Sequence, residues 1–309
     1  MNSEDSIGII ELGSVNLKCI IFRINNNNDS EILSATTTPS EGIQNDVVMN
    51  LKKASDSIRL AISTAEKKAK VSLKKIHVIF EQPDFLCTRF SKHKKIDDSK
   101  IHRSDIEFLL NEAKKQLILN DKNQSIIHIF NHNYIVDGKV FIEEPINVFA
   151  DTLTHEMTFI TAPKNNLRNI NQIFLDCDIE IERLISKTFA LGVELFNPRE
   201  LQSGVVSINL ESKKISLGLF KNLALVHSIT FPVGINHITN DISKVCSLNL
   251  EESLAIRNNT DFSFKNNQNL FDENNLLKKS FFVDSKFRKI SKDLIFKIIR
   301  ARTDEIFEM

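Results

Sequence analysis

The chain has 309 residues, 41% of them hydrophobic and 26% charged, and its Lys plus Arg and Asp plus Glu counts are both 40. This composition is ordinary for a soluble globular protein, and the zero net charge argues against a nucleic-acid partner held by a basic surplus. No stretch approaches the roughly 18 consecutive apolar residues that a membrane span needs. The sequence therefore predicts a cytosolic protein with room for two domains.

Cysteine and glycine usage also argue against particular kinds of site. The four cysteines lie far apart without a CxxC pair, so we interpret Cys19, Cys87, Cys177 and Cys246 as buried thiols rather than zinc ligands or disulfides. The chain has 8 glycines, where average usage predicts roughly 20. Few are left to line a phosphate-binding loop.

The N-terminal segment predicts a small sheet with one long helix. Residues 7–24 form two β-rich runs around a tight turn at Gly13, and residues 31–36 predict a third strand. Apolar residues at helical spacing predict a helix over residues 50–70. The nearly continuous apolar run at residues 76–80 is typical of a buried strand.

A different pattern follows and predicts a compact α+β insert. Residues 106–119 have helical spacing, with Ser104 as the expected N-cap. Asp137 and Gly138 form a strong hairpin-turn signal. Three strands are predicted at residues 126–130, 140–142 and 152–161.

The remaining residues repeat the order of strands and helices seen before the insert. Strands are predicted at residues 204–209, 214–220 and 224–231, and helices at residues 166–174, 186–196, 236–245 and 250–256. Residues 258–275 are polar and Asn-rich, which predicts a mobile loop. This recurrence indicates a duplicated α/β unit whose two lobes would hold a ligand between them.

A last helix is predicted from residue 286 to the end. Its apolar side chains recur on one face, which we expect to be core: Phe287, Ile290, Leu294, Ile298 and Ala301. The opposite face carries charged residues and is expected to be solvated.

Several segments, in order along the whole chain, resemble the FtsA family, the actin-like partners of the division tubulin FtsZ. Residues 231–242, FPVGINHITNDI, are similar almost letter for letter to that family's PVGG-x-HITNDIA run. Residues 250–257 and 299–309 resemble two further family segments. Residues 127–162 resemble the small subdomain in which the family differs from actin, and residues 8–23 its first phosphate loop.

The resemblance implies an α/β, actin-like (ribonuclease H-like), two-lobed fold with an inserted α+β SHS2-type subdomain. It assigns residues 1–82 and 160–200 to lobe 1 (subdomain 1A) and residues 83–159 to the insert (subdomain 1C). Residues 201–238 would form an incomplete core of lobe 2 (subdomain 2A), and residues 239–309 the partner-binding subdomain 2B.

The resemblance also implies a site for ATP and magnesium. The family positions fall on Glu11, Gly13, Ser14 and Asn16 in the first loop, Asn209 and Ser212 in the second, and Gly234 and Asn236 at a helix start.

Both loops depart from the family pattern. The first, normally Asp-Ile-Gly-Thr-Ser-Lys, has lost its lysine. The second, normally Asp-Ile-Gly-Gly-Gly-Thr-Thr-Asp, reads NLESKKIS at residues 209–216, without its three glycines and both aspartates. Glu211 would repel a triphosphate, and neutral Asn209 cannot supply the charge that a magnesium shell prefers. We therefore expect weak or absent ATP and magnesium binding and no enzymatic activity.

The same residues also have plainer, structural interpretations. Glu11 can simply end a strand, Gly13 and Gly234 can serve turns, and His237 is expected to be structural or capping rather than a metal ligand or general base. No nucleophile or carboxylate partner can be argued from the sequence for His128 or His132. No catalytic or metal-binding residue is predicted.

By resemblance, Arg302 and Glu305 match helix positions that hold the C-terminal tail of FtsZ. This implies an adaptor that recruits FtsZ at the inner face of the cell membrane. It also implies self-association into actin-like filaments, and contact with later division proteins through subdomain 1C. Family members continue past the position of Met309 to an amphipathic membrane-targeting helix, so membrane contact is expected only through a segment missing from this chain.

Two alternatives remain open at this point. One is the pilus-assembly relative PilM, which shares the inserted subdomain but binds the tail of a different membrane protein. The other is an active actin-fold ATPase or kinase.

Overall fold

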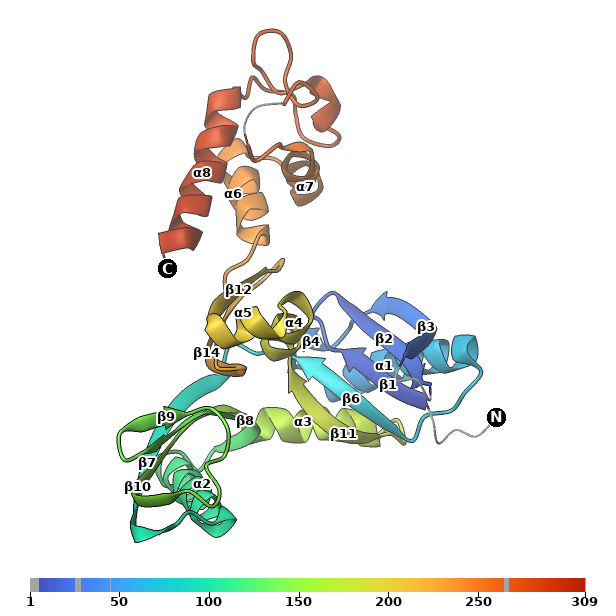
Figure 1. Cartoon of the computed structure of the whole chain (residues 1–309). Coiled ribbons are helices and arrows are strands. Elements are labelled where there is room, and N and C mark those ends of the chain that lie inside the picture. Colours follow the sequence, from blue (N-terminus) through green and yellow to red (C-terminus); the bar gives the residue numbers. More distant parts are fainter. Residues whose placement is uncertain (1–5, 26–28, 45, 264–266, 309) are drawn as a thin grey trace. The chain divides into compact units, whose positions relative to one another are not determined.

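The computed structural model describes residues 6–25, 29–44, 46–263 and 267–308 (Figure 1). The chain divides into two compact units, residues 1–209 with 216–230 and residues 210–215 with 231–309. Each unit has a hydrophobic core of its own. Among the described residues, no helix combines the length and apolar character that crossing a bilayer requires.

A five-stranded sheet dominates the first unit. Its strands are β1 (Ser6–Glu11), β2 (Asn16–Ile24), β3 (Ser30–Pro39), β6 (Lys75–Phe80) and β11 (Glu180–Ser186), in the order β11-β6-β1-β2-β3. The β1-β2-β3 meander is antiparallel, whereas β6 runs parallel to both β1 and β11. The predicted strand pair and third strand are confirmed. Because β1, β6 and β11 are parallel, their carboxyl ends meet at one edge of the sheet.

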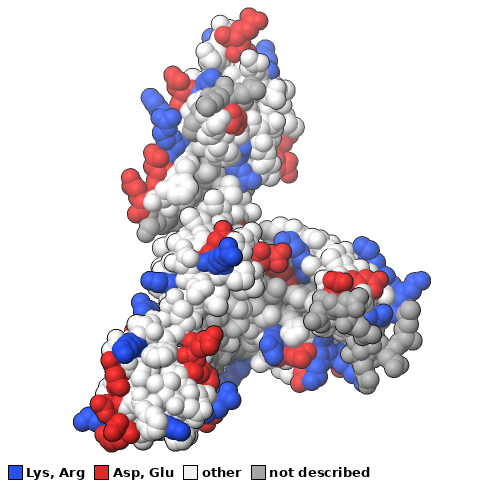
Figure 2. All heavy atoms as spheres, in the orientation of Figure 1, with Lys and Arg blue, Asp and Glu red and all other residues white. Residues whose placement is uncertain are grey.

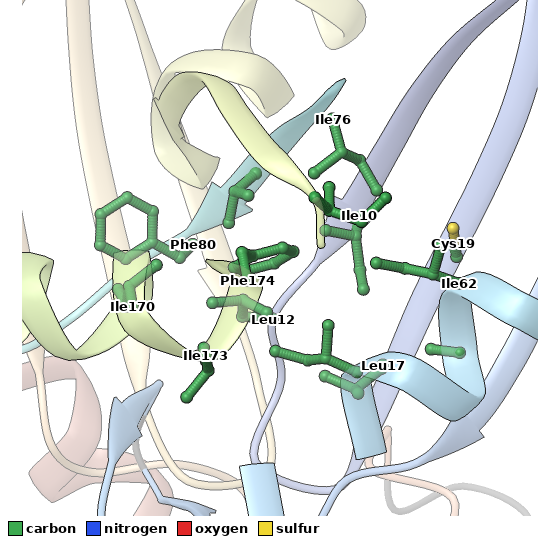
Figure 3. Packing of buried hydrophobic residues seen from close by; sticks show 14 of the residues in the cluster. Ile10, Leu12, Leu17, Cys19, Ile62, Ile76, Phe80, Ile170, Ile173 and Phe174 are labelled. Atoms are coloured by element: carbon green, nitrogen blue, oxygen red, sulfur yellow. The ribbon is translucent and has the colours of Figure 1, made fainter. Parts of the chain in front are cut away.

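Two helices pack against this sheet and close its core (Figure 3). Helix α1 (Leu51–Ala69) begins after Asn50, whose side chain accepts from the Lys53 amide at 3.0 Å, and α3 is Lys164–Leu175. The sequence predicted both. Ile10, Leu17 and Phe80 of the sheet lie in one buried cluster with residues of both helices. Two short strands, β4 (Ile43–Gln44) and β5 (Val47–Val48), pair with each other and were not predicted.

The insert is an antiparallel sheet with one helix. Its strands, in the order β7-β10-β8-β9, are β7 (Leu86–Lys100), β8 (Gln124–Val136), β9 (Lys139–Phe141) and β10 (Phe149–Pro163), and its helix is α2 (Arg103–Asn120). The β8–β9 hairpin turn falls on Asp137 and Gly138, with φ of 47° and 81°. The predicted hairpin is confirmed, because the tightest hairpin turns need positive φ at both central residues.

Two details of the insert differ from the sequence analysis. Strand β7 was not predicted, since it is rich in charged residues and has only two buried apolar ones, Phe90 and Ile96. The prediction of Ser104 as N-cap was wrong, because the helix begins at Arg103 after His102. The amide of His102 donates to the Asp105 carboxylate at 2.8 Å, which places the helix N-cap two residues earlier than expected.

Three strands follow the helices α4 (Lys187–Leu195) and α5 (Pro198–Ser203). They are β12 (Val205–Leu210), β13 (Ile215–Lys221) and β14 (Ala224–Phe231), in the order β12-β13-β14. All three strands and α4 were predicted, whereas α5 was not. Gly192 of α4 lies directly against the buried ring of Phe220, where an added Cβ would fall 2.0 Å from a ring carbon.

The second unit contains α6 (Asn236–Cys246), α7 (Leu250–Asn259), the short 3-10 helix η2 (Lys279–Phe281) and α8 (Lys292–Glu308). Helices α6 and α7 were predicted. Part of the expected Asn-rich loop, residues 264–266, lies outside the described residues.

The predicted start of the last helix at residue 286 was wrong, because α8 begins at Lys292. Leu277 donates its amide to the carbonyl of Ile290 at 2.8 Å, and Leu276 bridges Ser291, so this stretch pairs like a strand. The predicted apolar face is correct for two of its five residues. Ile290 and Ile298 are buried, but Phe287, Leu294 and Ala301 are exposed, and α8 buries Ile295 and Ile299 instead.

Candidate functional site

The carboxyl edge of β1, β6 and β11 is the place where open α/β sheets ordinarily bind ligands. Glu11 is the last residue of β1, Glu81 follows β6, and Lys187 follows β11. The Lys187 Nζ lies 2.5 Å from one Glu11 oxygen, and the Lys18 Nζ lies 3.2 Å from the other. Burial by itself would raise the pKa of Glu11, but the two lysines, Lys187 foremost, hold that pKa below its usual value. Glu11 is therefore an ionised carboxylate with lysines on both oxygens.

Glu81 lies deeper at the same edge and is 1% exposed. Its carboxylate accepts from the Ser186 hydroxyl at 2.8 Å and from the Thr188 amide at 2.9 Å, at the start of α4. The Thr230 hydroxyl lies 3.5 Å from its other oxygen. The amide of Glu81 in turn donates to the Asp46 carboxylate at 3.3 Å. This hydrogen-bond network joins the ends of β6, β11 and β14.

The remaining predicted residues of the first loop serve the β1–β2 turn. An added Cβ at Gly13 would fall 2.5 Å from the carbonyl oxygen of Asn16, so the turn itself requires glycine. The Ser14 hydroxyl accepts from the Asp46 amide at 3.4 Å, and Asn16 opens β2 opposite Pro39. Gly13, Ser14 and Asn16 thus make local packing contacts in and beside the β1–β2 turn.

The predicted second loop belongs mostly to the second unit and packs against the start of α6. The amides of Ile235 and Asn236 donate to the carbonyls of Glu211 and Ser212 at 2.9 and 2.8 Å. An added Cβ on Gly234 would lie 2.4 to 2.6 Å from backbone atoms of residues 211, 213 and 214. These two amides, which would otherwise face an anion, are thus engaged by this turn.

Charge in this turn is also balanced within the chain. Lys214, 2% exposed, lies 3.9 Å from the Glu211 carboxylate, the group that the sequence analysis expected to repel phosphate. The His237 ring lies 3.1 Å from the Gly234 carbonyl, which fits a structural position. Asn209 lies in β12 of the first unit. Among the described residues, no three His, Cys, Asp or Glu side chains are grouped to hold a metal ion.

Lys187 and Glu81 were missed by the sequence analysis. Each directly follows a parallel strand, and that position is the signal that would have identified them. It becomes visible only once β6 and β11 are known to be parallel neighbours of β1.

Arg302 of α8 is held within the second unit. Its guanidinium makes a two-point contact with Asp241 of α6, at 2.6 and 3.1 Å, and a further bond to Glu305 at 2.6 Å. The pair Arg302–Glu305 is thus in contact, as their spacing of three residues implies. Arg302 remains partly accessible, with 22% of its side chain exposed, and Glu305 is 59% exposed.

A groove of about 550 Å³ lies in the first unit where the insert meets the five-stranded sheet. Strand β8, the edge strand β11 and helix α4 contribute to its lining, with His128, Arg183 and Phe189 among the residues. The ring of His128 accepts a hydrogen bond from the Ser186 amide at 2.9 Å. Edge strands offer unpaired backbone groups that can pair with an extended segment.

Three histidines of the insert sheet are held neutral. Burial lowers the pKa of His128, His132 and His155 to about 4 in each case. His132 contacts the Thr158 hydroxyl, and His155 contacts the Asn131 side chain at 3.1 Å. Their contribution to folding stability is therefore complete above the ordinary pKa of 6.5 and is lost as the pH falls from 6.5 towards 4.

We expect the free energy of unfolding of the first unit to fall as the pH is lowered from about 7 to about 4.5. Replacing His155 with glutamine should lower the number of protons taken up on unfolding by about one, and so make the free energy of unfolding less dependent on pH. Urea unfolding across this range measures the proton uptake, and His93→Gln, an exposed histidine of the same sheet, is the control. An unchanged slope in His155→Gln would contradict the assignment.

Figure 2 shows basic and acidic side chains interspersed over the described part of this face.

Comparison with known proteins adds the family relationship. Residues 86–161 match the model of the SHS2 domain inserted in FtsA. The cell division protein FtsA of Agrobacterium fabrum is 21% identical over 98% of this chain and 70% of its own length. FtsA of Bacillus subtilis is 23% identical over 100% of this chain and 69% of its own length.

A solved PilM–PilN complex of type IV pilus biogenesis has a similar fold, with a TM-score of 0.63 at 11% identity. The match covers 98% of this chain and 74% of that chain. The predicted actin-like fold with an inserted SHS2-type domain is therefore confirmed.

Proposed function

Because this chain belongs to the FtsA family as a divergent member, we propose that it acts in cell division as an adaptor for the tubulin-like polymer FtsZ. The observation that carries this proposal is the similarity to FtsA proteins over nearly the whole chain, together with the SHS2 domain match. In this role the protein works at the inner face of the cell membrane. It self-associates into actin-like filaments and is not an enzyme.

The proposed docking surface for the FtsZ tail is the end of α8 around Arg302 and Glu305. A guanidinium that binds carboxylates at two points suits recognition of an acidic peptide. Since Arg302 already contacts Asp241, a bound tail would share or exchange that contact. Removing the charge should therefore affect both the peptide and the packing of α6 against α8, and the test has to separate the two.

Replacing Arg302 with glutamine is expected to weaken binding of a labelled FtsZ C-terminal peptide about tenfold, which corresponds to about 1.4 kcal/mol. Fluorescence anisotropy at low salt measures the dissociation constant. Lys297→Gln, which removes an exposed positive charge from the same helix, should bind like the unaltered chain. Asp241→Asn removes the intramolecular partner and should preserve binding.

Equal loss of peptide binding in Arg302→Gln and Asp241→Asn, together with a lower Tm in both, would show that the role of Arg302 is purely structural.

Peptide binding is also expected to be the same with and without Mg-ATP. This nucleotide independence is supported by the engaged amides at Ile235 and Asn236 and by the charge-balanced Glu211.

The groove between β8 and β11 is our proposed contact for later division proteins. An extended apolar segment could pair with the edge of β11 and place side chains beside Phe189.

A scaffold of the PilM kind is the second candidate function, favoured by the similar fold of the PilM–PilN complex. Binding of a PilN peptide in place of the FtsZ peptide would select it. Sustained phosphate release from ATP would instead select the active ATPase.

A further inference from the structure

We propose that the chain completes the carboxyl edge of its first sheet with its own charges, a lysine as resident cation and a glutamate as resident anion. Lys187 supplies the cation at Glu11, and Glu81 supplies the anion at the first turn of α4. The edge at which this topology ordinarily binds ligands is then occupied and hydrogen-bonded by the protein's own side chains. This inference concerns the first unit only and does not depend on which partner the protein recruits.

The resident cation is defined by contact and partial burial. Lys187 and Glu11 are 17% and 22% exposed and lie 2.5 Å apart, whereas Lys18, on the other oxygen of Glu11, is 58% exposed. The pair joins the end of β1 to the first residue of α4. An ion pair this sheltered is coupled more strongly than a surface pair, which salt and water screen. Lys187 therefore contributes more to holding this edge together than Lys18 does.

The resident anion lies at a helix N-terminus, where unsatisfied amides attract negative charge. The Glu81 carboxylate accepts from the Thr188 amide, and the Ser186 hydroxyl, which donates to the same oxygen, itself accepts from the Phe189 amide at 3.3 Å. On the other side, the Thr230 hydroxyl is 3.2 Å from the Ser216 hydroxyl and 3.5 Å from Glu81. The position that an external anion would take is thus occupied by a buried side chain.

The two resident charges reinforce each other because Lys187 and Thr188 are consecutive. Glu81 orients the backbone of the first turn of α4, and that turn directs the Lys187 side chain to Glu11. An external polyphosphate or metal would have to displace both contacts to reach this edge. The first unit should therefore reach full stability without any ligand.

A double-mutant cycle on the full chain tests the cation. Lys187→Met is expected to lower the Tm by about 5 °C, and the matched control Lys18→Met by about 1 °C. The double variant Glu11→Gln, Lys187→Met should lose clearly less than the two single losses combined, because each single change leaves the partner charge unpaired. Equal effects of the two lysines, or simple additivity, would overturn the assignment.

The anion is tested by chemical rescue. Glu81→Ala should lower the Tm and recover part of the loss when sodium acetate is added, since acetate can accept from the freed Thr188 amide. Acetate should not raise the Tm of the unaltered chain or of Glu81→Gln above that of sodium chloride at equal ionic strength. The Tm of the unaltered chain should also be unchanged by Mg-ATP. A rise with Mg-ATP, or identical responses of Glu81→Ala to acetate and chloride, would refute the resident anion.

Discussion

Replacing Glu252 with alanine is expected to destabilise the second unit by about 4 kcal/mol. The carboxylate is 2% exposed, and one of its oxygens accepts from the consecutive amides of residues 283, 284 and 285 at 2.8 to 2.9 Å. Its other oxygen accepts from the Ser285 hydroxyl at 2.6 Å and from the Asn249 amide at 3.0 Å. Removing it leaves several donors without their acceptor and detaches the segment before α8 from α7.

The same carboxylate predicts a loss of stability in acid. Burial alone would raise the pKa of Glu252, but the hydrogen bonds from Ser285, Asp284 and Asn249 lower it from 4.5 to about 2. A folded-state pKa below the unfolded one stabilises the fold above pH 4.5, and this contribution is lost as the pH falls towards 2. At neutral pH this contribution is fully present.

Urea unfolding followed by circular dichroism, at neutral pH and down to about pH 3, measures both effects. Glu251→Ala is the matched control, because Glu251 is the exposed neighbour in the same turn of α7. It should change the free energy of unfolding by no more than about 0.5 kcal/mol. A comparable decrease in the free energy of unfolding in the two variants would mean that the hydrogen bonds from the amides of residues 283–285 to Glu252 do not stabilise the second unit.

The fold could be predicted from the sequence wherever one face of an element is apolar. Helix α1 and strand β6 have that pattern, and both were predicted within one or two residues. Strand β7 lacks it, because it is an edge strand with mostly charged residues facing water. For helix α8 the apolar pattern is instead longer than the helix. Its apolar spacing extends back to Phe287, but pairing of residues 276–277 with residues 290–291 keeps that stretch out of the helix.

Residues of the candidate site could be predicted only where they belong to a local turn. Gly13 was identified because the β1–β2 turn is formed by neighbouring residues. Lys187 is 176 residues from Glu11 in sequence, and Glu81 is 107 residues from Thr188. No local pattern marks such pairs, since it is the parallel pairing of β1, β6 and β11 that brings them together.

Replacing Gly234 with alanine is expected to destabilise the second unit by about 3 kcal/mol. The added methyl group would lie 2.4 Å from the Glu211 carbonyl oxygen and 2.6 Å from the amide nitrogens of Lys213 and Lys214. All three are backbone atoms, so relief requires moving the 210–215 turn away from α6. That movement would break the bonds from the Ile235 and Asn236 amides.

Thermal and urea unfolding of Gly234→Ala measure this cost, with Gly8→Ala as the control for adding a methyl group at a crowded glycine. The nearest atom at Gly8 is the end of the Leu73 side chain, which can rotate, so that loss should stay near 1 kcal/mol. A Gly234→Ala protein as stable as the unaltered chain would show that the turn does not need this close approach. The glycine would then be free to serve the phosphate position that the family resemblance implies, and Mg-ATP titration of both proteins would be the decisive comparison.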